Sequence, residues 1–344
     1  MPIGRCWLAV ALFLVAPAAS AWNDAGHMIA ALIAYDALPV EVRASAARLL
    51  REHPRFHEDF EKQLPRNLAK AAPALQDRWY FAFGATWPDE ARRFDRAPAA
   101  ARDALVARYN HGSWHYIDLP TYLRPSDRRQ IHMESPSTAW TADMDDAHLN
   151  IVQALEKLTT NWCAPAPSDA ERALALSWIA HLIADLHQPM HSTSMFAVPA
   201  FIHGDRGGND ILVVDGSNLH ALWDGALGDD RRWRHLDALA REFGPATANE
   251  AAKGFQTDLP GDFRSWAKHS RSLASNVVYS ADVRAAVAAA TQSQPPRVSI
   301  GNEYRDAMSA TAKQQIGLAG HRIALVLQTL LADNGRSVCS QQTH

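Results

Sequence analysis

The run HLIADLHQPMH, residues 181–191, decides how this 344-residue chain is organised. It closes a helical pattern of apolar residues that extends over residues 169–186. His181 and Asp185 are four residues apart, so on a helix their side chains lie on one face and meet. His191 comes after a proline has turned the chain, and it can approach the same region from another side.

A second run, NLHALWD at residues 218–224, repeats this spacing with His220 and Asp224. Imidazole and carboxylate groups are the non-thiolate donors that zinc prefers in proteins. A single His–Asp pair four residues apart is weak support, because helices often form ordinary salt bridges at that spacing. Two such pairs together with the HQPMH turn favour a metal site.

Helical patterns cover most of the remaining chain. The apolar spacing predicts helices over residues 24–38, 40–53, 141–160, 169–186, 232–243, 281–290 and 303–331, the last of which could be two helices hinged near Gly317. Ser168 is placed to cap the helix over 169–186, and Pro189 follows its end. The clearest strand covers residues 211–214, before an Asp215-Gly216 turn. Since the chain has no repeat and no low-complexity linker, the pattern predicts one mainly α domain.

The composition excludes several classes of protein. Hydrophobic residues make up 47% and charged residues 21% of the chain, values typical of a globular protein and not of a disordered, collagen-like or coiled-coil one. The 34 Lys and Arg residues against 37 Asp and Glu residues give a net charge of -3. An anionic partner must therefore be held by local positive charge and not by a broadly basic surface.

Residues 1–21 have the pattern of an export signal. Arg5 supplies a positive start, residues 6–15 form an apolar run, and Ala19-Ser20-Ala21 is a small-residue cleavage site. The apolar run is too short to span a bilayer, which disfavours the alternative of a membrane anchor. We expect cleavage after Ala21, a mature domain over residues 22–344, and a periplasmic or secreted location without stable membrane association.

Two cysteines, Cys163 and Cys339, remain after this cleavage. Export implies an oxidising compartment, which permits one disulfide between them. The sequence does not give their separation in space, so it leaves both the bonded and the free state open.

Further candidate ligands lie nearer the start of the chain. Asp89 ends a WPD run and precedes Arg92, His115 begins an HYID run, and the mature chain opens with Trp22, five residues before His27. The α-amino group freed by cleavage has an ordinary pKa of about 7.7–8.0, so it can lose its proton and bind a metal. The carbonyl oxygen of the same residue can close a chelate ring. Signal cleavage would then be a condition for assembling the site.

These runs occur together in an order and spacing that resemble the S1/P1 nuclease family. The resemblance rests on Trp22 with His27, WPD at 87–89, HYID at 115–118, HLIADLHQPMH at 181–191, GGN at 207–209 and NLHALWD at 218–224. It covers most of the mature chain. It implies the mainly α, single-domain fold that P1 nuclease shares with zinc-dependent phospholipase C, including a short β-hairpin.

The resemblance also implies three zinc ions held by nine residues, with one carboxylate shared between two ions. The three ligand sets would be Asp89, His115 and His181 with the bridging Asp185; Asp185 and His27 with the amine and carbonyl of Trp22; and His191, His220 and Asp224. Water would complete the coordination of the third ion.

The family chemistry then assigns catalytic roles to Asp89, Arg92 and Asp185. A water shared by two zinc ions would become hydroxide near neutral pH, because metal binding lowers its pKa from 15.7 towards about 7. That hydroxide would attack phosphorus in line, and the third zinc would stabilise the departing 3′ oxygen. Arg92 would meet the charge that builds on the phosphate; the alternative for Arg92 is a surface salt bridge.

Three residues are candidates for substrate binding by the same resemblance. Tyr116 would stack on a base and Asp118 would hydrogen-bond the edge of that base. Asn209 would fix a turn beside the site or contact the substrate directly. Stacking tolerates any base but needs it exposed, which favours single strands over duplex. The alternative for Tyr116 is packing in the core.

The sequence therefore predicts an exported, zinc-dependent, monomeric endonuclease. Its partners would be single-stranded DNA, RNA and nucleotides, its products would carry 5′-phosphates, and it would also act as a 3′-nucleotidase. A zinc-dependent phospholipase C is the enzymatic alternative, disfavoured because those enzymes usually place Glu where this chain has Asp224. A non-catalytic periplasmic zinc-binding protein is the alternative from another class. The preferred base, the DNA-to-RNA preference and the pH optimum do not follow from the sequence.

Overall fold

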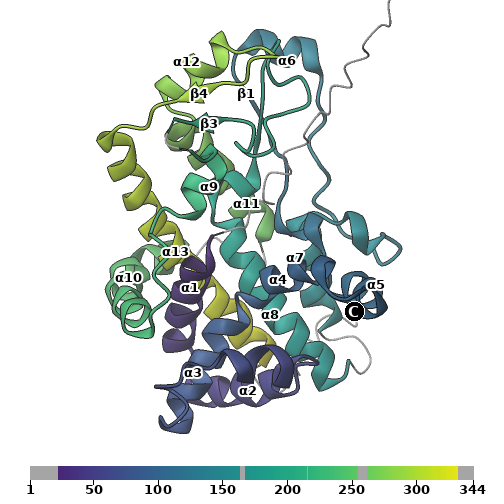
Figure 1. Cartoon of the computed structure of the whole chain (residues 1–344), viewed down its shortest axis with the longest axis vertical. Coiled ribbons are helices and arrows are strands. Elements are labelled where there is room, and N and C mark those ends of the chain that lie inside the picture. The colour runs from purple at the N-terminus through teal and green to yellow at the C-terminus, as the bar shows by residue number, and fades with distance from the viewer. Residues whose placement is uncertain (1–21, 163–166, 215, 255–261, 332–344) are drawn as a thin grey trace, which may run out of the picture.

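The computed structural model describes residues 22–162, 167–214, 216–254 and 262–331, and it confirms a mainly α fold (Figure 1). The α-helices are α1 (Asp24–Ala37), α2 (Val40–Arg51), α3 (Pro73–Gly84), α4 (Trp87–Ala91), α5 (Ala99–Tyr109), α6 (Pro125–Ile131), α7 (Ile151–Asn161), α8 (Asp169–Leu186), α9 (Leu219–Asp224), α10 (Trp233–Gly254), α11 (Phe263–Leu273), α12 (Ala281–Ala289) and α13 (Asn302–Leu331). The strands are β1 (Pro120–Tyr122), β2 (Ser194–Phe196), β3 (Leu212–Val213) and β4 (Arg297–Val298). Short 3-10 or π turns cover Phe56–Phe60, Glu61–Gln63, Arg92–Arg96, Gly112–His115, Asp146–His148, Pro189–Ser192 and Ala274–Val278. The predicted export signal and both Cys163 and Cys339 lie outside the described residues.

Most of the predicted helices are present with nearly the expected bounds. The prediction for α8 is confirmed at both ends, and Ser168 caps it: the Glu171 N–H donates to Ser168 Oγ at 3.2 Å while the Glu171 carboxylate accepts from the Ser168 N–H. α10 is longer than predicted and continues through Pro245 to Gly254. Its packing against α1 and α13 compensates for the hydrogen bond that the proline cannot make.

The predicted helix over residues 141–160 is wrong in its first half, because α7 begins only at Ile151. Asn150 has extended backbone, and its Oδ1 accepts hydrogen bonds from the N–H groups of Val152 and Gln153 at 3.1 and 3.2 Å. Asp145 caps a separate 3-10 turn upstream. Asx side chains that bond to nearby backbone compete with helix continuation, and here they set the helix start.

α13 is one continuous helix, so the predicted hinge near Gly317 is wrong. The two glycines of its middle section serve helix packing instead. A Cβ atom on Gly317 would lie 2.3 Å from Thr247 Oγ1 of α10, and one on Gly320 would lie 2.6 Å from Ile33 Cβ of α1. Only glycine lets α1 and α10 approach α13 this closely.

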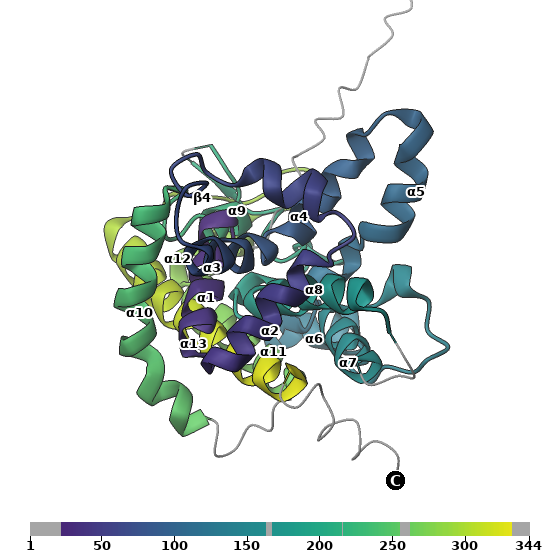
Figure 2. The same cartoon turned by 90° about the horizontal axis from the view of Figure 1, so that it is seen from below.

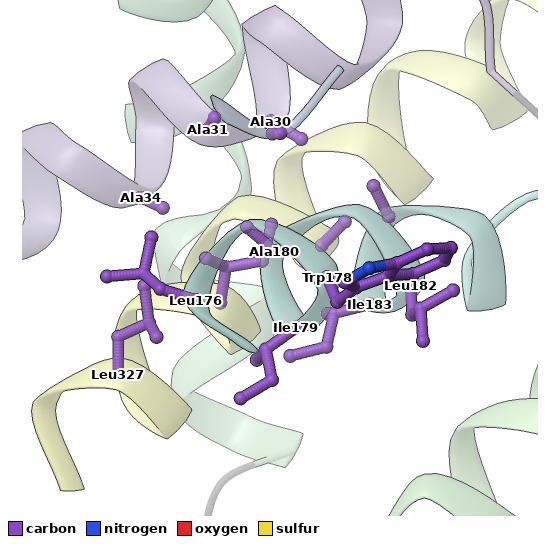
Figure 3. Packing of buried hydrophobic residues seen from close by; sticks show 14 of the residues in the cluster. Ala30, Ala31, Ala34, Leu176, Trp178, Ile179, Ala180, Leu182, Ile183 and Leu327 are labelled. Carbon is purple, nitrogen blue, oxygen red and sulfur yellow. The ribbon is translucent and has the colours of Figure 1, made fainter. Parts of the chain in front are cut away.

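α8 forms the centre of the fold and contacts α1, α2, α3, α4, α7, α11 and α13. Every residue from 176 to 186 is buried, which explains why this stretch is apolar on all sides apart from its functional residues. Figure 3 shows Ala31 and Ala34 of α1 on one side of Leu176 and Ala180, with Leu327 of α13 beyond. Small side chains on α1 allow the close packing that fixes α8 in place.

Other helices surround α8, and two short elements also contact it. Figure 2 shows α1, α10 and α13 side by side on one flank, consistent with their mutual contacts, while α5 projects from the body near α4. α4 and the 3-10 turn Gly112–His115 both contact α8. These two short elements bring distant parts of the chain to the central helix.

The strands form two parallel pairs and not a regular hairpin. β1 pairs with β2, with Thr121 opposite Met195, and β3 pairs with β4, with Val213 opposite Val298. The short β-hairpin implied by the resemblance is absent from the described strands, where antiparallel pairing is limited to isolated bridges such as that between Leu212 and Asn218. The backbone around β3 bonds to the segment near residue 298 instead, since Val214 N–H donates to Val298 O at 3.0 Å. None of the helices in the described ranges has the length and apolar character needed to cross a membrane.

Candidate metal centre

Three groups of His and Asp side chains converge near the end of α8. In each group one potential ligand atom from every residue lies within 4.8 Å of the others. The groups are His27, His181 and Asp185; Asp89, His115 and His181; and His191, His220 and Asp224. They contain all eight side-chain ligands that the resemblance implied. The third group is the expected set, whereas His181 belongs to both of the first two groups and Asp185 only to the first.

Asp185 joins the first two groups through its two carboxylate oxygens. Its Oδ1 lies 3.2 Å from His27 Nε2 of α1, and its Oδ2 lies 3.0 Å from His115 Nδ1 and 3.1 Å from His181 Nε2. Asp89, from α4, is farther out, with Oδ1 at 3.9 Å from His115 Nδ1. Because Oδ1 faces His27 and Oδ2 faces His115 and His181, this carboxylate is placed to bridge two cations.

Backbone carbonyl groups orient several of the imidazole rings. His181 Nδ1 donates to Ala85 O at 2.7 Å, so the neutral ring presents the lone pair of Nε2 to the carboxylates. The Ala85 carbonyl precedes α4, and this hydrogen bond ties that helix to α8. Such a bond on the outer ring nitrogen fixes the tautomer and the orientation that a metal ligand needs.

The third group shows the same arrangement twice. His191 Nδ1 donates to His115 O at 2.6 Å, and His220 Nδ1 donates to Gly207 O at 2.7 Å. The two Nε2 atoms then face one another at 3.0 Å, with their lone pairs converging. Asp224 Oδ1 lies 3.6 Å from His220 Nε2. Two converging lone pairs and a carboxylate form a donor set that suits a divalent cation.

The first two groups contain buried polar atoms that have no hydrogen-bond partner, and these atoms indicate whether a metal ion fits there. Asp185 Oδ1, Asp89 Oδ2 and both ring nitrogens of His27 are buried and have no such partner. Buried polar groups normally form hydrogen bonds, so orphaned atoms at convergent positions need another explanation. Coordination of a cation by these imidazole nitrogens and carboxylate oxygens would explain why they lack hydrogen bonds. This donor set suits Zn²⁺.

The ionisation states of the first two groups are strongly coupled. Burial alone would raise the pKa of Asp185, but His181, His115 and His27 around it hold that pKa well below its usual range. Burial alone would lower the pKa of His181, but the charges of Asp185 and Asp89 raise it. The carboxylate is therefore an anion near neutral pH. A metal ion would displace the proton that the imidazole otherwise holds.

In the third group the histidines are kept neutral. Burial, together with the nearby His191, lowers the pKa of His220 to about 3, and burial also lowers the pKa of His191. Burial raises the pKa of Asp224 well above its usual range, although the Gln188 amide donates to its Oδ1 at 2.7 Å. Neutral imidazole is the form that binds metal, so these two rings are ready to coordinate at neutral pH.

Trp22 lies beside these groups, although its side chain is used for packing. The indole is fully buried, and its Nε1 donates to Ala184 O of α8 at 3.0 Å. The next residue, Asn23, donates its backbone N–H to Asp224 O at 3.1 Å. Hydrogen bonds thus hold the start of the mature chain to α8, through the Trp22 indole, and to α9, through the Asn23 N–H.

Arg92 and the three residues proposed for substrate binding line one pocket of about 210 Å³. Arg92, Tyr116, Asp118 and Asn209 share its wall with the candidate ligands His115, His191 and His220. Tyr116 is 45% exposed, which rules out packing in the core as its sole role. The pocket therefore connects the metal groups with an exposed aromatic ring.

Several charged groups line this pocket. Arg92 Nη1 lies 3.3 Å from Asp89 Oδ1, next to the metal groups. Enclosure by the surrounding protein raises the pKa of Asp118 to about 6, an effect that the charge of Arg206 opposes. Asn209 stabilises the loop that contains it, because its side-chain amide donates to Arg206 O at 2.8 Å and its Oδ1 accepts from the Asn218 side chain.

Sequence reasoning missed several parts of this site. Gln188 stands inside the HLIADLHQPMH run, and only the structure shows that it bonds to Asp224. Arg206, which has a left-handed backbone with φ of 55°, lines the same pocket as Asp118, and sequence reasoning assigned it no role. The carbonyl groups that orient the rings belong to the backbone, so no residue type could have indicated them.

His187 lies within the same run but outside all three groups. It is fully buried, its Nδ1 donates to Ile183 O at 2.7 Å, and its Nε2 accepts from Arg322 of α13 at 2.7 Å. Its role is to connect α8 with α13, as expected for a structural histidine.

Three His and Asp groups on a helical scaffold define a candidate multi-metal centre, and comparison with known proteins gives the family. The S1/P1 nuclease model matches residues 22–332, and the chain therefore belongs to the S1/P1 nuclease family. Nuclease S1 of Aspergillus oryzae is 22% identical over 178 residues, which cover 50% of this chain and 59% of that protein. Endonuclease 4 of Arabidopsis thaliana is 21% identical over 267 residues, 72% of this chain and 76% of that protein. Family membership supports a nuclease, with nucleic acid as the class of substrate.

We expect Asp185→Asn to remove about two bound ions per chain, because the amide cannot bridge the first two groups. The third group does not contain Asp185 and should keep its ion. Metal content after dialysis, measured by mass spectrometry, would check this stoichiometry.

Asp127→Asn is the matched control. Asp127 is also buried and accepts a hydrogen bond from the Arg124 N–H, but it caps α6 and belongs to none of the three groups. Equal metal content in wild type and Asp185→Asn would contradict the bridging role.

Proposed function

We propose that the chain is an exported, zinc-dependent endonuclease that hydrolyses single-stranded DNA and RNA to 5′-phosphorylated products, with 3′-nucleotidase activity. The observation that carries the proposal is the convergence of three His and Asp groups beside one pocket that holds Arg92 and the exposed ring of Tyr116. A nucleotide needs both kinds of contact, one for its phosphate and one for its base.

The eight side chains of the three groups, with the Trp22 amine and carbonyl, would hold three Zn²⁺ ions. When bound, these ions supply an activated water as nucleophile and neutralise charge on the phosphate and on the leaving oxygen. The residues fit that role because Asp185 presents one oxygen to each of two groups and the third group has two neutral imidazoles. Three cations would also give this weakly acidic protein a local positive charge for the phosphodiester.

The side chains of the pocket position the substrate. Arg92 reaches towards Asp89 from the rim of the first two groups, where its guanidinium can bind phosphate oxygens. The exposed ring of Tyr116 can stack on a base. Asp118 borders the same pocket, and its carboxyl group can hydrogen-bond the base edge. A stacked base must leave its duplex, which accounts for a preference for single strands.

The polarity of this pocket supports a nuclease over a phospholipase C. Two arginines, an acid and an amide line it together with one exposed tyrosine, whereas an acyl chain would need an apolar surface. The same set of contacts disfavours a zinc-binding protein without turnover.

Export and processing complete the proposal. Removal of residues 1–21 would leave Trp22 as the amino terminus of a periplasmic or secreted, monomeric single domain, not stably bound to a membrane. The hydrogen bond from the Asn23 N–H to Asp224 O supports the role of Trp22 as a ligand, because it holds the start of the mature chain beside the third group.

Digestion of heat-denatured DNA by the processed protein, with and without EDTA, tests the function. We expect release of 5′-phosphorylated mononucleotides that EDTA abolishes, because no ligand group can activate water without its cation. Chromatography of the products, before and after phosphatase treatment, identifies the position of the phosphate.

Phosphatidylcholine is the second substrate in this assay. A zinc-loaded protein that cleaves it and leaves DNA intact would establish the phospholipase alternative. A zinc-loaded protein that cleaves neither would be a zinc-binding protein.

Arg92→Ala should lower kcat on single-stranded DNA by roughly 10²- to 10³-fold, because the arginine would meet charge that develops in the transition state. KM and zinc content should change little. Arg93→Ala is the neighbouring control, since Arg93 is 64% exposed and pairs with Glu90 outside the pocket. Unchanged turnover of the Arg92→Ala protein with full zinc would assign Arg92 to a salt bridge alone.

A methionine retained before Trp22 should reduce both activity and the number of bound ions by about one, because an amide nitrogen cannot chelate as the free amine does. Enzymatic removal of that methionine should restore both. An extended protein with full activity and full metal content would rule out the amino-terminal chelate.

A further inference from the structure

A second hollow lies outside the pocket of the metal centre. Its volume is about 500 Å³, and it is bordered by β1, α6, the segment after α6, and α11. We call it the α11 groove and define it by Leu119, Pro120, Tyr122, Arg128, Met133, Ser135, Pro136, Thr138, Arg264, Ala267, Lys268 and Arg271. It shares no lining residue with the pocket that holds Tyr116.

Positive charge distinguishes the α11 groove. Arg264, Lys268 and Arg271 follow one another at spacings of four and three residues, so they lie on one face of α11. Arg128 adds a fourth cation from α6. Among the described residues that line the groove there is no carboxylate, although the whole chain carries a net charge of -3.

Three of these cations have no ion-pair or hydrogen-bond partner in the part of the chain that the structure describes. The side chains of Arg128, Arg264 and Lys268 are exposed and form no ion pair or hydrogen bond with any residue in the described ranges. Glu156 interacts electrostatically with Arg264 but accepts its hydrogen bond from the Trp140 N–H. A groove with three unpaired cations is suited to an anionic ligand that brings several charges.

The fourth cation is structural and keeps the groove in shape. Arg271 donates from Nε and Nη2 to Pro120 O at 3.0 and 2.6 Å, which ties α11 to β1. Tyr122 and the 46% exposed Met133 offer apolar surface beside the charges, and Tyr122 Oη donates to Met133 O. A positively charged groove that also holds an aromatic side chain, here Tyr122, is suited to single-stranded nucleic acid.

We propose that the α11 groove binds the sugar–phosphate backbone of a single-stranded nucleic acid at a site separate from the pocket of the metal centre. This inference rests on the proposed nuclease function. Asp118 borders the pocket and Leu119, the next residue, borders the groove, so one extended segment separates the two. A long strand held in the groove stays near the metal centre between cleavage events, whereas a dinucleotide is too short to benefit.

The test replaces two exposed cations of the groove, as Arg264→Gln with Lys268→Gln. For a single-stranded 40-nucleotide DNA we expect kcat/KM to fall roughly three- to tenfold, and its dependence on salt, as log–log slope, to become shallower by about 1.4. For a dinucleotide, kcat/KM should not change. Arg271 is left in place because its loss would disturb β1.

The control is Arg66→Gln with Lys70→Gln, which removes the same charge at the same spacing. Both residues are exposed, and neither lines the groove or the pocket. Equal losses in the two double variants would mean that total charge matters and would overturn the proposal. Unchanged kinetics of the groove variant on the long DNA would overturn it as well.

Binding measurements separate this proposal from the function itself. Fluorescence anisotropy with a phosphorothioate 40-mer reports affinity whether or not the protein hydrolyses DNA. Weaker binding by the groove variant alone would support the groove even if the wild type proved inactive. Weaker binding of the groove variant to phosphatidylglycerol vesicles, with unaltered DNA affinity, would overturn the proposal and assign the groove to a membrane surface.

Discussion

The burial of one carboxylate among three imidazoles constrains this structure more than any other interaction. Asp185 is fully buried on the central helix α8, and His27, His115 and His181 surround it. An anion without solvent is costly unless opposite charge or hydrogen bonds compensate it. The compensation must come from α1 and from the turn before β1, so the chain must bring three distant segments to one point. The alanines of α1 and the glycines of α13 make that approach possible.

The backbone participates in the site as much as the side chains do. Carbonyl groups of Ala85, His115 and Gly207 each hold one histidine ring, and each belongs to a segment that also supplies a ligand or lines the pocket. The placement of the third group therefore depends on the second, because His115, which contacts Asp185, also orients the ring of His191 through its carbonyl. Folding and metal binding should be coupled in such a site, because the unfolded chain offers no preformed set of ligands.

The sequence predicts those parts of the fold and site that depend on local spacing. The two His–Asp pairs follow from helical periodicity, and the start of α8 follows from the capping residue Ser168. His27 and Asp89 could be assigned only through the resemblance to a family, because nothing in their local sequence fixes a partner. The parallel pairing of β3 with β4 and the bond from Gln188 to Asp224 depend on tertiary contacts. The error at residues 141–150 has a local cause, since Asn150 bonds to the backbone ahead of it.

The close contact between α1 and α13 has a consequence for how the protein can evolve. Gly320 faces Ile33 and the Ala30 carbonyl without room for a side chain, and His27 lies on α1 one turn before Ala30. A larger residue at position 320 would push α1 as a rigid body and carry His27 away from Asp185. Substitutions at the contact between α1 and α13 should therefore reduce activity even at positions that touch neither a metal ligand nor the substrate. We expect substitutions in α13 to be limited by the position of His27 in the site as well as by the stability of the fold.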